Sequence, residues 1–495
     1  LHKDGKVVAR AESTTPGETI SFDGQPCGMY KATFQLSLPD GTTLKGESVK
    51  INTSSRALPF PTVPAIDPAP PKSLKGGHRF YNNVKSYFLE VKFQPGGLAT
   101  LNKENAQSLS LYNRLKNTLT FKPVFSAELI KQKQLEEFAD FYRIDGVIAH
   151  HELIPLANEL ETLDYVIYCS VTPDTRHMSA PKLPVAPLNE TQVKPLPATE
   201  DPITPDFRPL QRYVDKPRGM NIRSIWSTHT GKGSTVRLLD FGVYANHEDL
   251  QNVQVVTNVP ETEDCNHGTA SSGCIVATDN SFGVKGIAHD CQFFFYDVGD
   301  LDLIVRDASL GDIVALNVQF ESDDGYIPII DSKSWWDKIH ALTRRDVTVV
   351  VAAGNSGLDL SKGYISDFGD SGGTLVGCCY SSTGDRHAYS NYGHYTSWFN
   401  SWGENVTTTG YSSLQDRGIN ASYSNSYSGT SSATPLCAAA MAVIQGYAML
   451  EMERYYPPLV FREAARYYGY DEGAEGGIGY RPNVADWLED LIKQQ

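Results

Sequence analysis

The chain has 495 residues, more than one cooperative core usually holds, so we expect roughly two to four domains. Its formal net charge of −15 argues against nucleic acid as the main partner, because phosphates are bound mostly by clustered Lys and Arg. No apolar run approaches the roughly 18 to 20 residues of a membrane-spanning helix, so we expect no membrane span.

The first segment alternates apolar and polar residues in "YKATFQLSLPDGTTLKG", with Asp40-Gly41 as a hairpin turn. This pattern is typical of antiparallel strands, and it predicts a β-sandwich-like module over 1–56 that is incomplete at its amino end. Because the chain begins at Leu1 without Met or a signal-like apolar run, we expect that a preceding segment has been removed or lies outside this sequence. The Pro-rich stretch 57–78 then predicts an extended linker.

A small α+β domain is predicted over 79–172, where strand patterns such as "SYFLEVKF" and "DYVIYCSV" enclose helical ones such as "SAELIKQKQLEEFADF". A second Pro-rich connector covers 173–208, and its composition predicts an exposed tether.

From 209 to 495 apolar strands alternate with helices, as in "STVRLLD", "GDIVALNVQF" and "VTVVVAAGN". Strands that are apolar on both faces and separated by helices predict a parallel sheet covered on both sides, an α/β architecture. Chemistry in such sheets gathers at the carboxyl ends of the strands.

Eight cysteines are scattered along the chain without a CxxC pair or Cys/His spacing, which argues against zinc. Cys265 and Cys291 flank one helix-sized unit and could form a disulfide. Cys378, Cys379 and Cys437 lie in apolar segments and are predicted to be buried thiols.

Three residues could together form a nucleophilic site. Asp240 ends an apolar strand, His267 precedes a small-residue helix, and Ser431 begins the apolar helix "SSATPLCAAAMAV". Each alone has an ordinary explanation as a cap or turn residue. A serine hydroxyl, however, becomes a nucleophile when an imidazole takes its proton and a carboxylate orients that imidazole. The other nearby histidine, His247, looks better suited to fixing its own loop.

The Ser431 N–H is one of the free donors at a helix amino end, where an oxyanion could bind. Asn355, which follows the buried strand "VTVVVAAG", could supply the second donor through its side-chain amide, although a turn role would also fit.

The segments "LLDFG" with "HEDL", "HGT", "AAGNSG" and "SGTSSATP" stand in that order and resemble the motifs of subtilisin-like serine proteases. The resemblance covers about 205–495 and implies a subtilisin-like fold with Asp240 orienting, His267 as general base and acid, Ser431 as nucleophile and Asn355 at the oxyanion. It also implies that 79–172 is a prodomain that inhibits the enzyme by laying its carboxyl-terminal tail in the cleft.

The sequence departs from the family pattern near the expected substrate strand. "LNVQFESDDG" stands where many members carry a Ser-Leu-Gly-like strand, and Phe241 replaces a small hydroxyl residue. Asn317, Gln319 and Gly354 are the expected substrate-binding residues. Since Asn317, Gln319 and Phe320 are bulky, we expect a restricted specificity, for small side chains or for basic ones if Glu321 reaches the pocket.

The sequence thus predicts a serine endopeptidase that acts on polypeptides, needs no cofactor and is made as a zymogen inhibited by its own prodomain. The resemblance implies a secreted or cell-surface protein. Calcium stabilises many family members, but no loop here has a recognisable ligand spacing. The alternative is an adhesion or binding protein with an inactive or permanently inhibited protease domain. A serine esterase is disfavoured because the GxSxG elbow and a late His are missing around Ser431.

Overall fold

The computed structural model describes residues 74–103, 109–182, 204–361 and 368–493, and the backbone of six short strands within 1–52. The predicted linker over 57–78 and tether over 173–208 lie largely outside the described residues, as does most of the predicted module over 1–56. The six strands form two antiparallel groups, β2-β1-β3-β6 and β4-β5. Their bounds are His2–Lys3, Lys6–Val7, Met29–Lys31, Phe34–Ser37, Thr43–Gly46 and Lys50–Asn52 for β1 to β6.

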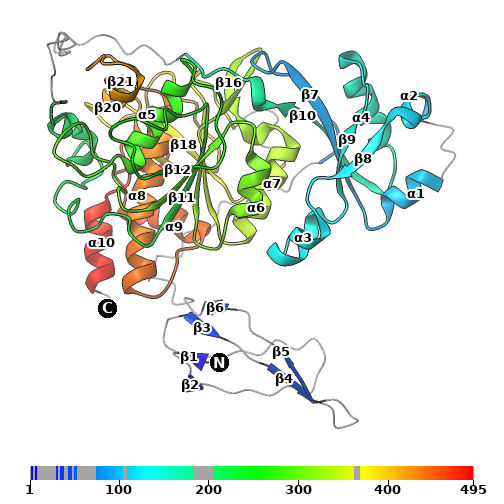
Figure 1. Ribbon diagram of the computed structural model, residues 1–495, viewed down its shortest axis with the longest axis horizontal. Coiled ribbons are helices and arrows are strands. Elements are labelled where there is room, and N and C mark those ends of the chain that lie inside the picture. Colours follow the sequence, from blue (N-terminus) through cyan, green and yellow to red (C-terminus); the bar gives the residue numbers. More distant parts are fainter. Residues whose placement is uncertain are drawn as a thin grey trace.

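The large domain (residues 204–493) is built on a seven-stranded sheet in the order β12-β13-β11-β14-β17-β18-β19, with every neighbouring pair parallel (Figure 1). Most of these strands are apolar and buried on both faces, as their sequences predict. The predicted α/β class is confirmed for this domain. The strands are Thr235–Asp240 (β11), Val253–Val255 (β12), Gln292–Asp297 (β13), Ile313–Leu316 (β14), Thr348–Ala352 (β17), Thr374–Cys379 (β18) and Ser397–Trp402 (β19).

Helices cover both faces of this sheet. Helices α5 (Cys265–Val276) and α8 (Thr430–Glu451) pack in one hydrophobic cluster, and α6 (Leu301–Asp307) and α7 (Lys333–Arg344) pack in the other. Apart from short 3-10 helices, the described part of the domain has two further antiparallel strand pairs and two further helices. They are Gln319–Ser322 (β15) with Gly325–Pro328 (β16), Val406–Thr409 (β20) with Tyr423–Tyr427 (β21), Pro458–Tyr468 (α9) and Val484–Lys493 (α10).

Helix α8 is long and apolar enough to cross a membrane by length and composition, but most of it is buried against the central strands. Its apolar character is therefore explained by packing inside the domain. The disulfide considered for Cys265 and Cys291 is not formed, and both are buried free thiols. The Cys265 sulfur lies against the Thr262 N–H and the Pro260 carbonyl instead.

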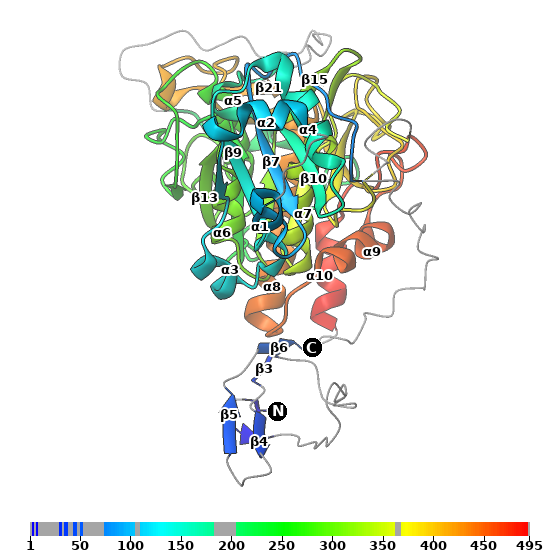
Figure 2. The same ribbon diagram turned by 90° about the vertical axis from the view of Figure 1, so that its right-hand side faces the viewer.

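The N-terminal unit (residues 74–182) contains a four-stranded antiparallel sheet in the order β10-β7-β9-β8. Helices α2 and α4 cover its outer face, which Figure 2 shows toward the viewer. The unit comprises Ser86–Phe93 (β7), Gly97–Lys103 (α1), Ser110–Leu115 (α2), Thr120–Pro123 (β8), Ala127–Lys133 (α3), Phe141–Asp145 (β9), Leu153–Glu161 (α4) and Val166–Asp174 (β10).

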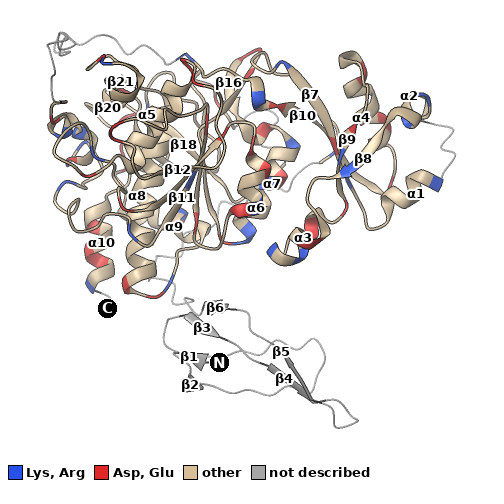
Figure 3. Ribbon diagram, viewed as in Figure 1, with Lys and Arg blue, Asp and Glu red and all other residues tan. Residues whose placement is uncertain are grey.

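The alternation of β7 divides its side chains between two surroundings. Leu89 and Val91 join the cluster under α2 and α4, whereas Glu90 and Lys92 point toward α7 of the large domain. Figure 3 shows acidic and basic residues on α6 and α7, which lie between the two sheets. The unit therefore meets the large domain through charged side chains as well as apolar ones.

The most enclosed ion pair between the two parts joins Glu90 to Lys338. Both side chains are buried, at 1% and 3% exposed. The Lys338 ammonium lies 3.1 Å from each Glu90 oxygen and 2.7 Å from Asp302, while Ser334 donates a further hydrogen bond to Glu90. A buried carboxylate of this kind depends on its partner, because solvent cannot replace it.

We predict that Lys338→Met destabilises the folded chain by about 3–5 kcal/mol, because Glu90 is left as an uncompensated buried charge. Guanidinium denaturation measures this in a Ser431→Ala background, which guards against self-digestion. The double variant Lys338→Met/Glu90→Gln is the control and should recover most of the loss. A single variant as stable as its parent would contradict the prediction.

Candidate active site

Two of the predicted site residues meet at the carboxyl edge of the parallel sheet. Asp240 is the last residue of β11, and His267 is in the first turn of α5. The Nδ1 atom of His267 lies 2.6 Å from Asp240 Oδ1, and both side chains are 0% exposed. With Nδ1 directed to the carboxylate, Nε2 is the ring nitrogen left to exchange a proton.

The second imidazole nitrogen is enclosed. His267 Nε2 is buried and has no hydrogen-bond partner within the described part of the chain. The rings of Phe241 and Tyr427 stand edge-on to the imidazole at centroid distances of 5.3 and 5.8 Å. Because a buried polar atom normally has a partner, this nitrogen marks a place where a reacting group could bind.

Ser431 is the second residue of α8 and is 1% exposed. The preceding Gly429 has φ of 82°, a left-handed conformation that glycine adopts without a steric cost. A Cβ at Gly429 would also lie only 3.0 Å from the Asn355 side chain. Glycine is thus what lets the chain turn into the helix beside Asn355, and the Ser431 N–H is one of the donors that the helix leaves unpaired.

A proline shapes the start of α8. Pro435 is the sixth residue of the helix and lacks the N–H that would otherwise bond to the Ser431 carbonyl four residues earlier. That carbonyl accepts hydrogen bonds from Tyr427 Oη at 2.8 Å and from Asn317 Nδ2 at 3.0 Å. Side chains from two other segments therefore replace the missing helical donor.

The side chain of Asn317 connects Asp240 with the start of helix α8. Asn317 follows β14 and is 1% exposed, and its Nδ2 also lies 3.1 Å from Asp240 Oδ2 and 2.9 Å from Ser271 Oγ. Asn317 is predicted from the sequence as a substrate-binding residue, and the structure puts its amide between the Asp240 carboxylate and the Ser431 backbone. These contacts fix the positions of Asp240 and Ser431 relative to each other.

Hydrogen bonds at both Oδ1 and Nδ2 orient the side-chain amide of Asn355. Its Oδ1 accepts hydrogen bonds from Thr430 N–H at 2.8 Å and from Thr430 Oγ1 at 3.1 Å. Its Nδ2 consequently points away from Thr430, with Gln319 Oε1 at 3.4 Å. The preceding Gly354 is buried with φ of 101°. Asn355, Gly354 and Gln319 therefore lie together beside the start of α8.

Two further residues near Asp240, His267 and Ser431 were not predicted from the sequence. Ser271 lies one turn after His267 on α5, and its hydroxyl donates to the His267 carbonyl and contacts Tyr427. The i, i+4 spacing could have identified Ser271. Tyr427 had no local signal. His247 is not brought to the site, because its Nε2 bonds to the Ser422 carbonyl at 2.9 Å.

A Ser, a His and an Asp at this sheet edge, with a helix amino end and an Asn amide beside the Ser, are the parts of an acyl-transfer site. The subtilase family model matches residues 231–455, a span that contains all four residues. Residues 231–455 are a subtilase domain.

Curated relatives are similar to about half of this chain. "Subtilisin-like protease 2" of Pseudogymnoascus destructans is 28% identical over 249 residues, covering 48% of this chain and 58% of the relative. "Minor extracellular protease Epr" of Bacillus subtilis is 26% identical over 249 residues, covering 46% of this chain and 34% of the relative. This chain therefore spans little more than half of the first relative and about a third of the second. A solved protease of Pseudoalteromonas arctica has a TM-score of 0.43 at 18% identity, covering 57% of this chain and 97% of that chain.

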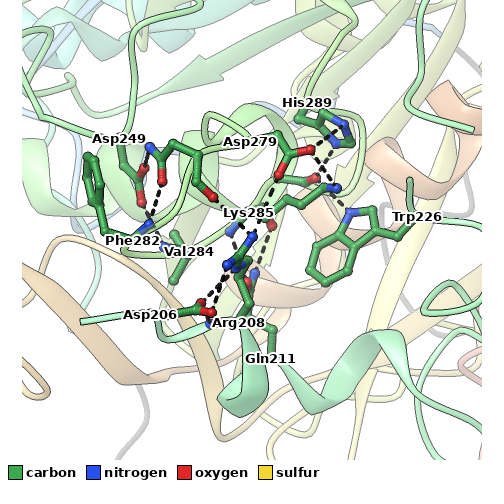
Figure 4. A network of polar contacts seen from close by, with 12 residues as sticks. Asp206, Arg208, Gln211, Trp226, Asp249, Asp279, Phe282, Val284, Lys285 and His289 are labelled. Atoms are coloured by element: carbon green, nitrogen blue, oxygen red, sulfur yellow. Dashed lines mark hydrogen bonds and ion pairs between the residues drawn. The ribbon is translucent and has the colours of Figure 1, made fainter. Parts of the chain in front are cut away.

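A second polar network anchors the subtilase domain where the chain enters it (Figure 4). The Asp249 carboxylate accepts hydrogen bonds from Val284 N–H and from Asn280 Nδ2, each at 2.7 Å. Gly283 bonds through its N–H to the Pro205 carbonyl. The loop after α5 is thereby tied both to Asp249 and to the entering segment.

This network does not by itself define a cation site. Each oxygen of the Asp249 carboxylate accepts an N–H bond. Among the described residues, no three His, Cys, Asp or Glu side chains gather as potential metal ligands.

We predict that Asn317→Ala slows the reaction of Ser431 with a fluorophosphonate reagent about ten- to hundredfold, since buried acceptors on Asp240 and Ser431 lose a shared donor. Ser271→Ala is the control, because it removes a neighbouring hydroxyl but keeps the bond between Asn317 and Asp240. Mass spectrometry of the labelled chain measures both rates. Equal labelling of Asn317→Ala and wild type would contradict a positioning role.

The buried carboxyl group of Asp249 should make the free energy of unfolding depend on pH. Burial raises its pKa to about 7, whereas an unfolded Asp titrates near pH ~3.9. Between these values the folded protein holds a proton that the unfolded chain has lost, so the free energy of unfolding falls as pH rises. In a Ser431→Ala background, the fall from pH 5 to pH 8 should be about 2–3 kcal/mol smaller in Asp249→Asn. Denaturant titrations measure it, and identical falls would refute the assignment.

Proposed function

We propose that the chain is a serine endopeptidase that hydrolyses polypeptides through an acyl-enzyme. The observation that carries the proposal is the enclosed His267 Nε2, with Nδ1 held by Asp240 at 2.6 Å. Asn317 Nδ2 ties the same Asp240 to the Ser431 carbonyl. Membership of residues 231–455 in the subtilase family supports the same chemistry.

In the proposed reaction, Ser431 Oγ attacks the scissile carbonyl while His267 Nε2 takes its proton. Asp240 stabilises the imidazolium, which then gives the proton to the leaving amine, and a water molecule hydrolyses the acyl-enzyme by the same route. The Ser431 N–H and Asn355 Nδ2 bind the oxyanion. The hydrogen bonds from Thr430 to Asn355 Oδ1 support this role, because they turn the amide donor away from Thr430.

Gln319 and Gly354 are proposed to line the substrate site, and Asn317 to act through its contacts with Asp240 and Ser431. Gln319 is 2% exposed, and Phe320 beside it is fully buried. The Gln319 side chain fills space next to Asn355, which supports a restricted preference for the substrate residue at the scissile bond. No cofactor takes part in the proposed steps.

The N-terminal unit is proposed to be a prodomain that inhibits the enzyme. After β10, its chain reaches the site region: Thr175 Oγ1 donates to the Val298 carbonyl at 2.7 Å, and Ala180 N–H donates to Asp264 Oδ1 at 3.1 Å. Asp264 stands three residues before His267. A secreted or cell-surface location is also proposed, consistent with the printed name of the Bacillus subtilis relative.

One observation favours a second candidate function. His267 is 0% exposed and Ser431 is 1% exposed while the N-terminal unit is attached. A chain that keeps this unit throughout its life would be a permanently inhibited protease, and it could serve as a binding or adhesion protein.

Intact mass over time tests the proposal, with the wild-type chain beside Ser431→Ala. We expect the wild type alone to break within 173–208, because that segment links the N-terminal unit to the large domain. Cleavage of both chains would point to a contaminating protease. An intact wild type that also resists fluorophosphonate labelling would contradict the proposed activity and favour the binding protein.

A further inference from the structure

A turn of the N-terminal unit lies against the strand that borders the site. Strand β15 starts two residues after Asn317, and its first residue, Gln319, lies beside Asn355. One edge of β15 pairs with β16. The backbone groups of Gln319 and Glu321 that point away from β16 form the other edge, which is open to an added strand.

Asn82 and Asn83 form hydrogen bonds with the backbone groups on that open edge of β15. Asn82 N–H donates to the Glu321 carbonyl at 2.7 Å. The Asn83 side chain accepts a hydrogen bond from Glu321 N–H at 2.8 Å and donates one to the Gln319 carbonyl at 3.0 Å. A carboxamide has one donor side and one acceptor side, as a peptide group does. The Asn83 side chain therefore takes the place of a peptide unit in an added strand.

The turn is held in shape before it meets β15. Val84 N–H bonds to the Tyr81 carbonyl at 3.1 Å, which closes the four residues 81–84, and Tyr87 Oη donates to the same carbonyl at 3.0 Å. Tyr81 is 4% exposed, and its ring stacks on Phe320 of β15 at a centroid distance of 4.4 Å. Its hydroxyl donates to Asp331 at 2.9 Å. A preformed, anchored turn binds with little further loss of entropy.

We propose that residues 81–84, called here the Asn83 turn, block the polypeptide-binding edge of β15 by imitating a substrate backbone. This inference rests on the proposed function and adds a second blocking segment to the tail at 175–182. An extended polypeptide adding to β15 needs the same three backbone groups that Asn82 and Asn83 occupy. The two cannot bind together, so the turn competes with substrate.

The experiment measures binding of fluorescein-labelled β-casein, an unfolded polypeptide, to the full chain carrying Ser431→Ala. Removing both side-chain bonds with Asn83→Ala should lower the Kd about tenfold, because the edge of β15 loses its competitor. Asn82→Ala is the matched control and should stay within about twofold, since Asn82 pairs with Glu321 through its main-chain N–H, which the variant retains. Fluorescence anisotropy gives both values.

A second variant guards against a general loosening of the fold. Asn83→Asp keeps the side-chain size, loses the donor to Gln319 and places a negative charge beside Glu321, so it should also tighten casein binding. Both Asn83 variants should melt within a few degrees of their parent. Unchanged casein affinity in both, or an equal gain in Asn82→Ala, would overturn the proposal.

The same variants with Ser431 restored separate this inference from the proposed function. Faster casein hydrolysis in Asn83→Ala than in Asn82→Ala is expected. Tighter casein binding by Asn83→Ala with no hydrolysis by any Ser431 chain would reject the peptidase and keep the blocking turn. Equal hydrolysis by all chains, with equal binding, would reject the turn and keep the peptidase.

Discussion

The site depends on the carbonyl of Ser431, which Pro435 leaves without a helical donor. Asn317 supplies a replacement and shares the same amide nitrogen with Asp240, so the start of α8 and the end of β11 are fixed to each other. Tyr427 bonds to the same carbonyl and faces His267. The carbonyl that Pro435 leaves free thus holds Ser431 and Asp240 in a fixed relative position. Without these donors, the buried carbonyl would be unsatisfied at a cost in stability.

Burial strengthens the hydrogen bond between His267 and Asp240. Asp240 and His267 are inaccessible to solvent, so their hydrogen bond is not weakened by competing water. The same enclosure leaves His267 Nε2 without a partner within the described chain. The N-terminal unit reaches this region through Ala180, which donates to Asp264 three residues before His267.

The N-terminal unit contacts the large domain through both apolar packing and buried ion pairs. Apolar residues of both parts share one cluster, in which Phe141 and Tyr168 lie with Ile339 of α7. Buried ion pairs such as Glu90 with Lys338 are set within it, and breaking such a pair costs more than forming it contributes. Polar contacts of this kind favour one geometry of docking. In that geometry the Asn83 turn meets β15 and the tail reaches Asp264.

The sequence alone determined the class of the large domain, because strands apolar on both faces that alternate with helices are typical of a parallel sheet covered on both sides. It also selected Asp240, His267, Ser431 and Asn355 as candidates, since the ends of parallel strands converge at one edge. Only the tertiary structure decided that Asn317 joins Asp240 to the Ser431 carbonyl, that Tyr427 and Asn317 replace the donor missing at Pro435, and that Asn83 pairs with residues 319–321. The disulfide considered for Cys265 and Cys291 was wrong for the same reason. These contacts join segments far apart in the chain, and no local periodicity or spacing encodes which distant groups a folded backbone brings within hydrogen-bond distance.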